Sequence, residues 1–113
     1  MLKHTTTAYK DKTIKFYCEH NPEKYKEYNS WIKSFPGVLN VNDNVINETT
    51  MERVIEFSNE DSYKKWLGSR KTQESWVQIK QYESEHGISV SGKNELILYS
   101  EDGIRVAIPR QSI

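Results

Sequence analysis

Alternating apolar and polar residues mark the predicted strands of this chain. The clearest alternation runs over residues 13–19, and similar patterns cover residues 38–45 and 51–57, on either side of a turn. We expect residues 13–19 and 51–57 to lie side by side in one sheet. Residues 1–12 are polar and rich in threonine, so we expect them to form a loosely held, flexible arm.

A first helix is predicted between the strands at 13–19 and 38–45. Asn21 is a suitable N-cap and Pro22 fits the first helical position, while the Pro36-Gly37 pair ends the helix. Apolar and aromatic side chains recur three or four positions apart and form one stripe: Tyr25, Tyr28, Ile32 and Phe35.

The second helical region follows the strand at 51–57. Residues 58–61 resemble a capping box, and Tyr63 and Trp66 continue the buried face of the helix. Residues 76–82 fit either a helix or a strand, and their length and charged flanks favour a second helical segment that ends at Gly87.

The C-terminal part predicts a hairpin. Residues 96–100 and 104–108 alternate on either side of Asp102-Gly103, a pair typical of a two-residue type I′ turn. Pro109 has no N–H to donate, so the outer strand should lie at a sheet edge. Residues 88–90 predict a further short strand before a turn.

This order of elements predicts an α+β fold with a ferredoxin-like βαββαβ plait. Its antiparallel sheet carries the helices on one face, and the hairpin adds an extra C-terminal strand. At 113 residues the chain is expected to form a single domain over 1–113.

Composition narrows the classes of function. Sixteen basic and sixteen acidic residues balance, which argues against nucleic acid and anionic membranes as partners. Cys18 is the only cysteine, so no intrachain disulfide is possible and a cytoplasmic location is expected. No apolar stretch is long enough to span a membrane. Frequent lysine and asparagine are typical of an AT-rich bacterial or phage genome.

Aromatic residues provide the candidate ligand site. Tyr25, Tyr28, Tyr63 and Trp66 could line a pocket for a flat aromatic ligand, or they could be ordinary core residues at helical spacing. Arg53 stands in an otherwise apolar row and either reaches the sheet edge or pairs inside. His20 and His86 lie far apart in the sequence, so neither a metal nor a cofactor is predicted.

Three motifs together resemble the antibiotic-biosynthesis-monooxygenase group of the dimeric α/β-barrel superfamily. They are Phe35-Pro36-Gly37-Val38, then Phe57-Ser58-Asn59-Glu60 leading into Trp66-Leu67-Gly68-Ser69, and the strand at residues 95–100. The resemblance implies a homodimer with a pocket between sheet and helices. It also implies oxygenase activity without a conventional prosthetic group.

The family's tryptophan matches Trp66, but Trp76 stands where the haem-degrading branch has a histidine. The resemblance therefore does not extend to haem degradation. The sequence leaves three classes of function open: a cofactor-independent oxygenase acting on a flat aromatic ligand, a non-enzymatic interaction or regulatory protein, and an RNA-binding plait. The charged residues Glu52 and Glu56 on the sheet disfavour the last of these.

Overall fold

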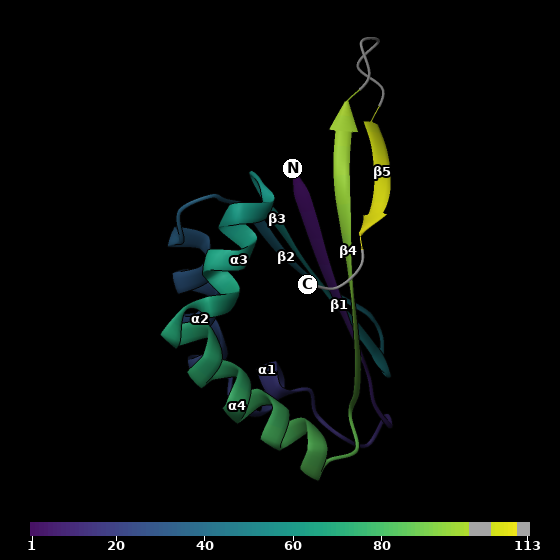
Figure 1. Cartoon of the computed structure of the whole chain (residues 1–113). Coiled ribbons are helices and arrows are strands. Elements are labelled where there is room, and N and C mark those ends of the chain that lie inside the picture. Colours follow the sequence, from purple (N-terminus) through teal and green to yellow (C-terminus); the bar gives the residue numbers. More distant parts are fainter. Residues whose placement is uncertain (100–104, 111–113) are drawn as a thin grey trace.

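The computed structural model describes residues 1–99 and 105–110, which form one antiparallel sheet and a layer of helices (Figure 1). The sheet order among the described strands is β2-β3-β1-β4-β5. In chain order the elements are β1 (Leu2–Tyr9), α1 (Tyr17–His20), α2 (Pro22–Ser34), β2 (Val38–Asn47), β3 (Thr50–Phe57), α3 (Glu60–Gly68), α4 (Arg70–Glu85), β4 (Ser89–Tyr99) and β5 (Arg105–Arg110).

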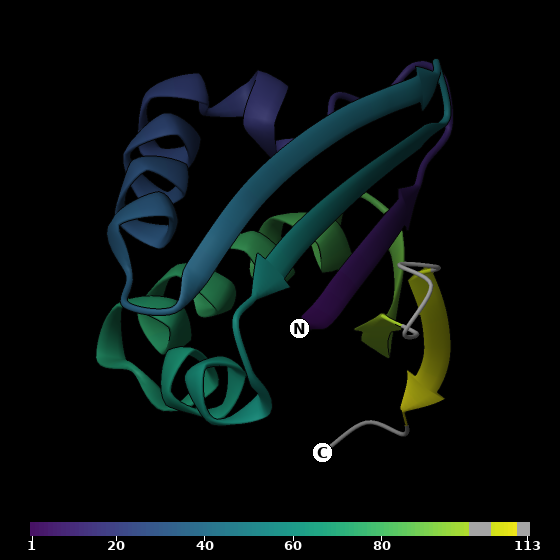
Figure 2. The ribbon, with the colours of Figure 1, turned by 90° about the horizontal axis from the view of Figure 1, so that it is seen from above.

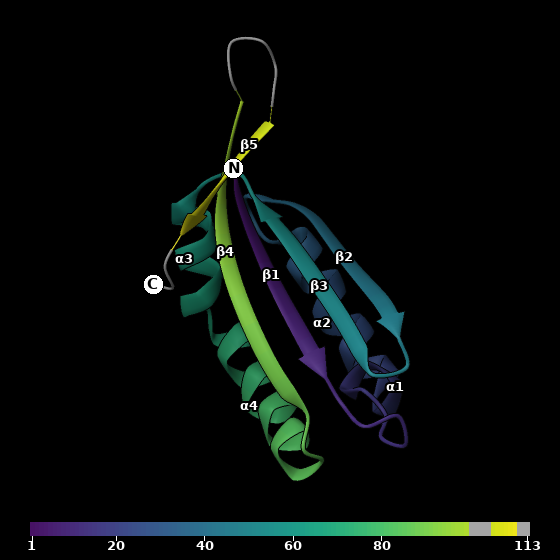
Figure 3. The same ribbon diagram turned by 90° about the vertical axis from the view of Figure 1, so that its right-hand side faces the viewer.

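The ferredoxin-like α+β fold predicted from the sequence is confirmed. Strands β2-β3-β1-β4 have the order of the βαββαβ plait, and β5 adds a strand at one edge. All described helices cover the same face of the sheet, and no described helix or strand covers the opposite face (Figures 2 and 3).

The flexible arm predicted for residues 1–12 is wrong, because β1 is the central strand of the sheet. It pairs along its whole length with both β3 and β4, with Leu2 opposite Phe57 on one side and Leu96 on the other. Its threonines are β-branched and suit a strand, although they are polar. Two neighbouring strands satisfy the backbone of this segment, so few apolar side chains are needed.

The strand predicted at residues 13–19 is also wrong. Phe16 is buried, as its alternation suggested, but the chain turns into the short helix α1 directly after it. The Glu19 carboxylate accepts a hydrogen bond from the Phe16 backbone N–H at 3.1 Å. This local side-chain bond closes a helical turn where a sheet partner would otherwise be needed.

The predicted ends of α2 agree with the structure, whereas the N-cap of α3 is Asn59, one residue after the Ser58 of the predicted capping box. The Asn21 side chain accepts from the Lys24 N–H and caps α2, and Asn59 does the same for the Ser62 N–H at the start of α3. Gly37 has φ +90° after α2, and a Cβ there would overlap the Ser62 side chain. The glycine therefore permits both the turn and its close contact with α3.

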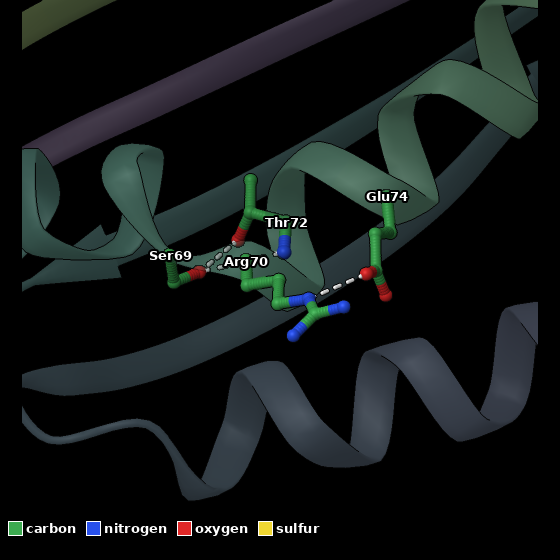
Figure 4. A network of polar contacts seen from close by, with 4 residues as sticks. All are labelled: Ser69, Arg70, Thr72 and Glu74. Carbon is green, nitrogen blue, oxygen red and sulfur yellow. Dashed lines mark hydrogen bonds and ion pairs between the residues drawn. The ribbon is translucent and has the colours of Figure 1, made fainter.

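Residues 76–82 belong to α4, as the favoured interpretation predicted. Ser69 separates α3 from α4, and its hydroxyl donates to the Trp66 carbonyl at 2.8 Å. The same hydroxyl accepts from the Thr72 N–H at 3.4 Å (Figure 4). Arg70 and Glu74 form an exposed ion pair one turn apart on α4. Within the described chain, none of the helices is long and apolar enough to cross a membrane.

The short strand predicted at residues 88–90, with a turn after it, is wrong. Strand β4 runs continuously from Ser89, and Gly92 pairs with Thr6 within it. The predicted edge position of the last strand is confirmed, since β5 pairs with β4 at one end of the sheet order. The Asp102-Gly103 turn lies outside the described residues.

Phe57→Ala should lower the free energy of unfolding by about 3–5 kcal/mol, because the Phe57 ring is fully buried. The ring lies 5.4 Å, centroid to centroid, from both Tyr63 and Trp66, so truncation leaves a cavity in the main core. Urea denaturation measures the loss. Val77→Ala, at an exposed site on α4, is the matched control and should change stability by less than about 0.5 kcal/mol. A loss below about 1 kcal/mol for Phe57→Ala would contradict this core.

Candidate functional site

An open cleft of about 310 Å³ lies between the sheet and the helices α3 and α4. The sheet contributes His4, Thr6, Arg53, Ile55, Val90 and Gly92, and the helices contribute Trp66, Trp76, Ile79, Lys80 and Glu83. A smaller cavity of about 70 Å³ adjoins it, sharing Thr6, Arg53, Ile79 and Glu83 with the cleft. The cleft and the smaller cavity are therefore neighbours, and three of the four residues that line both are polar or charged.

The cleft exists because small or polar residues occupy the helix-facing positions of β1 and β4. Successive side chains of a strand point to opposite faces, so His4 and Thr6 on β1 face the helices along with Leu2. Gly92 pairs with Thr6 on the neighbouring strand and contributes no side chain. A Cβ at Gly92 would meet only ordinary contacts, 3.7 Å from the Thr5 carbonyl oxygen and 3.9 Å from His4 Cε1.

His4 is held in place by a chain of side-chain hydrogen bonds. Its Nδ1 lies 2.6 Å from Oδ1 of the buried Asn94, and the Asn94 amide donates from Nδ2 to the Tyr63 hydroxyl at 3.1 Å. The Tyr63 and Trp66 rings pack against the imidazole, at 5.2 and 5.9 Å between centroids. Nε2 lies 3.3 Å from the Thr6 hydroxyl.

Burial lowers the pKa of His4 below its ordinary value of 6.5, and the positive charge of Arg53 acts in the same direction. The hydrogen bond from His4 Nδ1 to Asn94 Oδ1 opposes these two effects only in part. The imidazole is therefore neutral at pH 7.

Two tryptophans form the aromatic wall of the cleft. The Trp66 and Trp76 rings meet edge to face, with centroids 5.6 Å apart. Trp66 is almost completely buried, and its Nε1–H has no hydrogen-bond acceptor among the described residues. The Ser69 corner between α3 and α4 fixes the distance between these two side chains.

Arg53 connects the cleft to a polar network on α2. Its Nη1 donates to Asn29 Oδ1 at 3.1 Å, and the guanidinium lies over the Tyr25 and Tyr28 rings at 5.5 and 5.6 Å. Asp43 accepts hydrogen bonds from Asn29 and from the Tyr25 hydroxyl, at 2.7 and 2.9 Å. Of the two arrangements expected for Arg53, the structure shows the internal pairing.

A carboxylic acid faces the same cleft. Burial raises the pKa of Glu83 above its ordinary value of 4.5, and the nearby cations Arg53 and Lys80 offset part of that rise. The Lys80 ammonium lies over the Trp76 ring, 5.2 Å from its centroid. The polar end of the cleft thus combines two cations with one weakened acid.

The structure separates the five residues predicted as a ligand site. Trp66 and Arg53 line the large cleft, and Tyr25 lines the smaller cavity beside it. Tyr63 lies behind His4, whereas Tyr28 lines a different groove, between α2 and α4.

Sequence reasoning missed His4, Thr6, Gly92 and Asn94, because it assigned their segments to an arm and a turn. One signal was present: Leu2, His4, Thr6 and Ala8 alternate with polar residues and would all share one strand face.

Two histidines that are far apart in the sequence lie close together in the structure. His20 and His86 both pack on Tyr82, at 4.5 and 4.1 Å between ring centroids. The Tyr82 hydroxyl donates to the Lys15 carbonyl at 2.6 Å. This aromatic cluster therefore has a structural role, because it links α4 to the loop before α1. In the part of the chain that the structure describes, no three His, Cys, Asp or Glu side chains are grouped to hold a metal ion.

Comparison with known proteins finds similarity in structure only. No protein-family model and no curated sequence matches the chain. It is similar to a point mutant of SnoaB, a cofactor-independent oxygenase from Streptomyces nogalater, with a TM-score of 0.64 and 4% identity over 88% of this chain and 96% of that one.

Two further solved structures are similar. One is a putative antibiotic biosynthesis monooxygenase from Deinococcus radiodurans, with a TM-score of 0.60 and 9% identity, and the other is a dimeric ferredoxin-like protein from an uncultured marine organism, with a TM-score of 0.58 and 10% identity. Each match covers 88% of this chain and 95% of the other. The chain therefore has the ferredoxin-like fold of the antibiotic-biosynthesis-monooxygenase structures, as the sequence motifs predicted, and at these identities the likeness extends to the fold alone.

Replacing His4 should change how stability depends on pH. Because the pKa of His4 is lower in the folded than in the unfolded protein, its contribution is lost as the pH falls below 6.5, at no more than about 1.4 kcal/mol per pH unit. His4→Gln should remove this loss in urea titrations between pH 7.5 and 5.5.

The raised pKa of Glu83 changes the pH dependence of stability with the opposite sign. Glu83 is present in both wild type and His4→Gln, so its effect cancels when their slopes are compared. Val77→Ala, at an exposed site on α4, serves as the control and should keep the wild-type slope, since it removes no titratable group. Identical slopes for wild type and His4→Gln would contradict a neutral, partly buried His4.

Proposed function

We propose that this protein binds a flat aromatic small molecule in the cleft between β1, β4 and the helices α3 and α4. One observation carries the proposal: a space of about 310 Å³ has an edge-to-face tryptophan pair on one wall and a few polar groups on the other. Small-molecule sites are typically apolar or aromatic cavities of about 300–1,000 Å³ with a few convergent polar groups.

The two tryptophans have different parts in the aromatic wall. Trp66 is almost completely buried, including its Nε1–H, so it forms the fixed part of the wall. A flat ring would pack against Trp76, which is only partly buried.

For the reaction, we propose cofactor-independent oxygenation of such an aromatic molecule. The support is the fold shared with SnoaB, whose structure is described as that of a cofactor-independent oxygenase. In this type of reaction an electron-rich substrate supplies the electrons that reduce dioxygen. The protein then needs to bind and orient the substrate beside suitable polar groups, and His4, Arg53 and Glu83 all line this cleft.

Ligand binding can be tested with 2-acetylnaphthalene, a two-ring aromatic ketone, by following the three tryptophan indole N–H signals in NMR spectra. We expect the Trp66 and Trp76 signals to shift and the Trp31 signal to stay, because Trp31 does not line the cleft. Gly92→Leu should fill the cleft and weaken binding at least about tenfold. Gly92→Ala is the matched control and should still bind, since its Cβ fits without a clash.

Equal binding by both Gly92 variants would place the ligand elsewhere. The absence of binding to the wild type would favour the non-enzymatic interaction protein instead. Oxygenation is tested separately, as dioxygen uptake with anthrone above the uncatalysed rate, and uptake unchanged by Gly92→Leu would contradict a reaction in this cleft.

We also propose that the protein forms a homodimer through the β4–β5 ribbon. Among the described residues, β4 has only Met1 and β5 as neighbours in the sheet beyond Leu96, so the ribbon projects past the other strands (Figure 1). A two-stranded ribbon alone is marginally stable in water, and its free edge can pair with another strand. One of the similar structures is described as dimeric, and the charges of Glu52 and Glu56 disfavour contact across the open sheet face.

Light scattering at micromolar concentration should give twice the chain mass of 13.3 kDa. Val106→Lys, in the middle of β5, should shift the population toward the monomer, because it adds a charge to the proposed contact. Glu52→Lys, on the open sheet face, is the control and should leave the dimer intact. A wild-type monomer would refute the dimer, and a dimer unaffected by Val106→Lys would refute this contact surface.

A further inference from the structure

We propose that the ligand is a hydroxylated aromatic, and that its O–H donates a hydrogen bond to Nε2 of His4. The inference rests on the proposed function and narrows its ligand class from flat aromatics in general to phenols. It depends on which ring nitrogen of His4 carries the proton, and on what surrounds the other nitrogen.

The hydrogen-bond chain behind His4 determines its tautomer. The Asn94 amide donates from Nδ2 to the Tyr63 hydroxyl, and this orientation presents Oδ1 to the imidazole at 2.6 Å. An amide oxygen only accepts, so Nδ1 of His4 must be the donor. In the neutral ring the proton on Nδ1 leaves Nε2 with a lone pair, as an acceptor.

The surroundings of His4 keep this acceptor unprotonated. The charged groups facing the cleft are Arg53 on β3 and Lys80 and Glu83 on α4. Arg53 disfavours an imidazolium at His4, and the single carboxylic acid among these groups is itself weakened by burial. His4 forms no ion pair with any carboxylate among the described residues, so nothing there compensates a positive charge on its ring.

Space beside Nε2 is available for a ligand. The Thr6 hydroxyl lies 3.3 Å away, which is long for an O–H···N hydrogen bond, and it can rotate when another donor approaches. Gly92 places no side chain against the Cε1 edge of the ring, the edge between the two nitrogens. A ligand in the cleft can therefore reach Nε2 along the floor of the site.

The groups around Nε2 of His4 favour a ligand with a neutral hydrogen-bond donor over an anionic ligand. An aromatic carboxylate would gain from Arg53, but it would bring a second negative charge beside Glu83 and would offer Nε2 no proton. A phenol supplies the missing donor and keeps its ring against the tryptophans. The Nε2 acceptor thus provides the polar contact for a hydroxylated ring system, and the tryptophan rings provide the aromatic wall beside it.

The test compares 2-naphthol with 2-methoxynaphthalene, which has the same rings but no hydroxyl proton. Wild type should bind 2-naphthol about three- to tenfold more tightly, the worth of one hydrogen bond. His4→Phe keeps an aromatic ring at this position and should bind both compounds alike. In wild type the preference should fade only as the pH falls through the lowered pKa of His4 and the ring becomes protonated, whereas binding of 2-methoxynaphthalene should not change in this way.

The outcomes separate this inference from the proposed function. Equal binding of both compounds by wild type, or a preference that persists in His4→Phe, overturns the phenol assignment and leaves aromatic binding intact. Failure of both compounds to shift the Trp66 and Trp76 signals overturns both proposals. If His4→Phe does not fold, long-range ¹H–¹⁵N NMR of wild type decides: the Nδ1–H tautomer is expected, and an Nε2–H tautomer refutes the inference.

Discussion

The structure depends on the pairing of β1 with strands on both of its sides. This segment is polar and would not bury itself, yet β3 and β4 take up its backbone hydrogen bonds along its whole length. Leu2 is thereby placed in the core beside Phe57, and His4 is placed under the helices. The core and the cleft therefore both depend on β1, which contributes Leu2 to the core and His4 to the sheet side of the cleft.

The helix layer completes the cleft through one corner. Ser69 ends α3 and begins α4, and its hydroxyl bonds to both helices. Trp66 and Trp76 lie on opposite sides of that corner and meet edge to face. A side chain without any direct contact with a ligand thus determines the spacing of the aromatic wall.

The sequence predicted those helices and strands whose caps, apolar stripes or alternation lie within their own segment. Helix α2 has a cap, a stripe and a glycine stop, and β3 alternates, so both were found. β1 was missed because its stability comes from two partner strands far along the chain. The alternation at residues 13–19 correctly indicated that Phe16 is buried, but a local hydrogen bond from the Phe16 N–H to the Glu19 carboxylate favoured a helical turn. The same distinction applies to the site: Trp66 and Arg53 stand out in their own segments, whereas His4, Gly92 and Asn94 become neighbours only through strand register.

Substituting Gly92 should affect the stability of β4 and the volume of the cleft in opposite ways. Glycine in the middle of a strand destabilises it by about 0.5–1 kcal/mol relative to alanine, and here nothing around the missing Cβ requires glycine. A larger residue would both favour the strand and close the space beside His4. Fold stability and an open cleft are therefore in conflict at this one site, so selection for stability alone would tend to close the cleft, and selection for ligand binding would tend to keep the glycine.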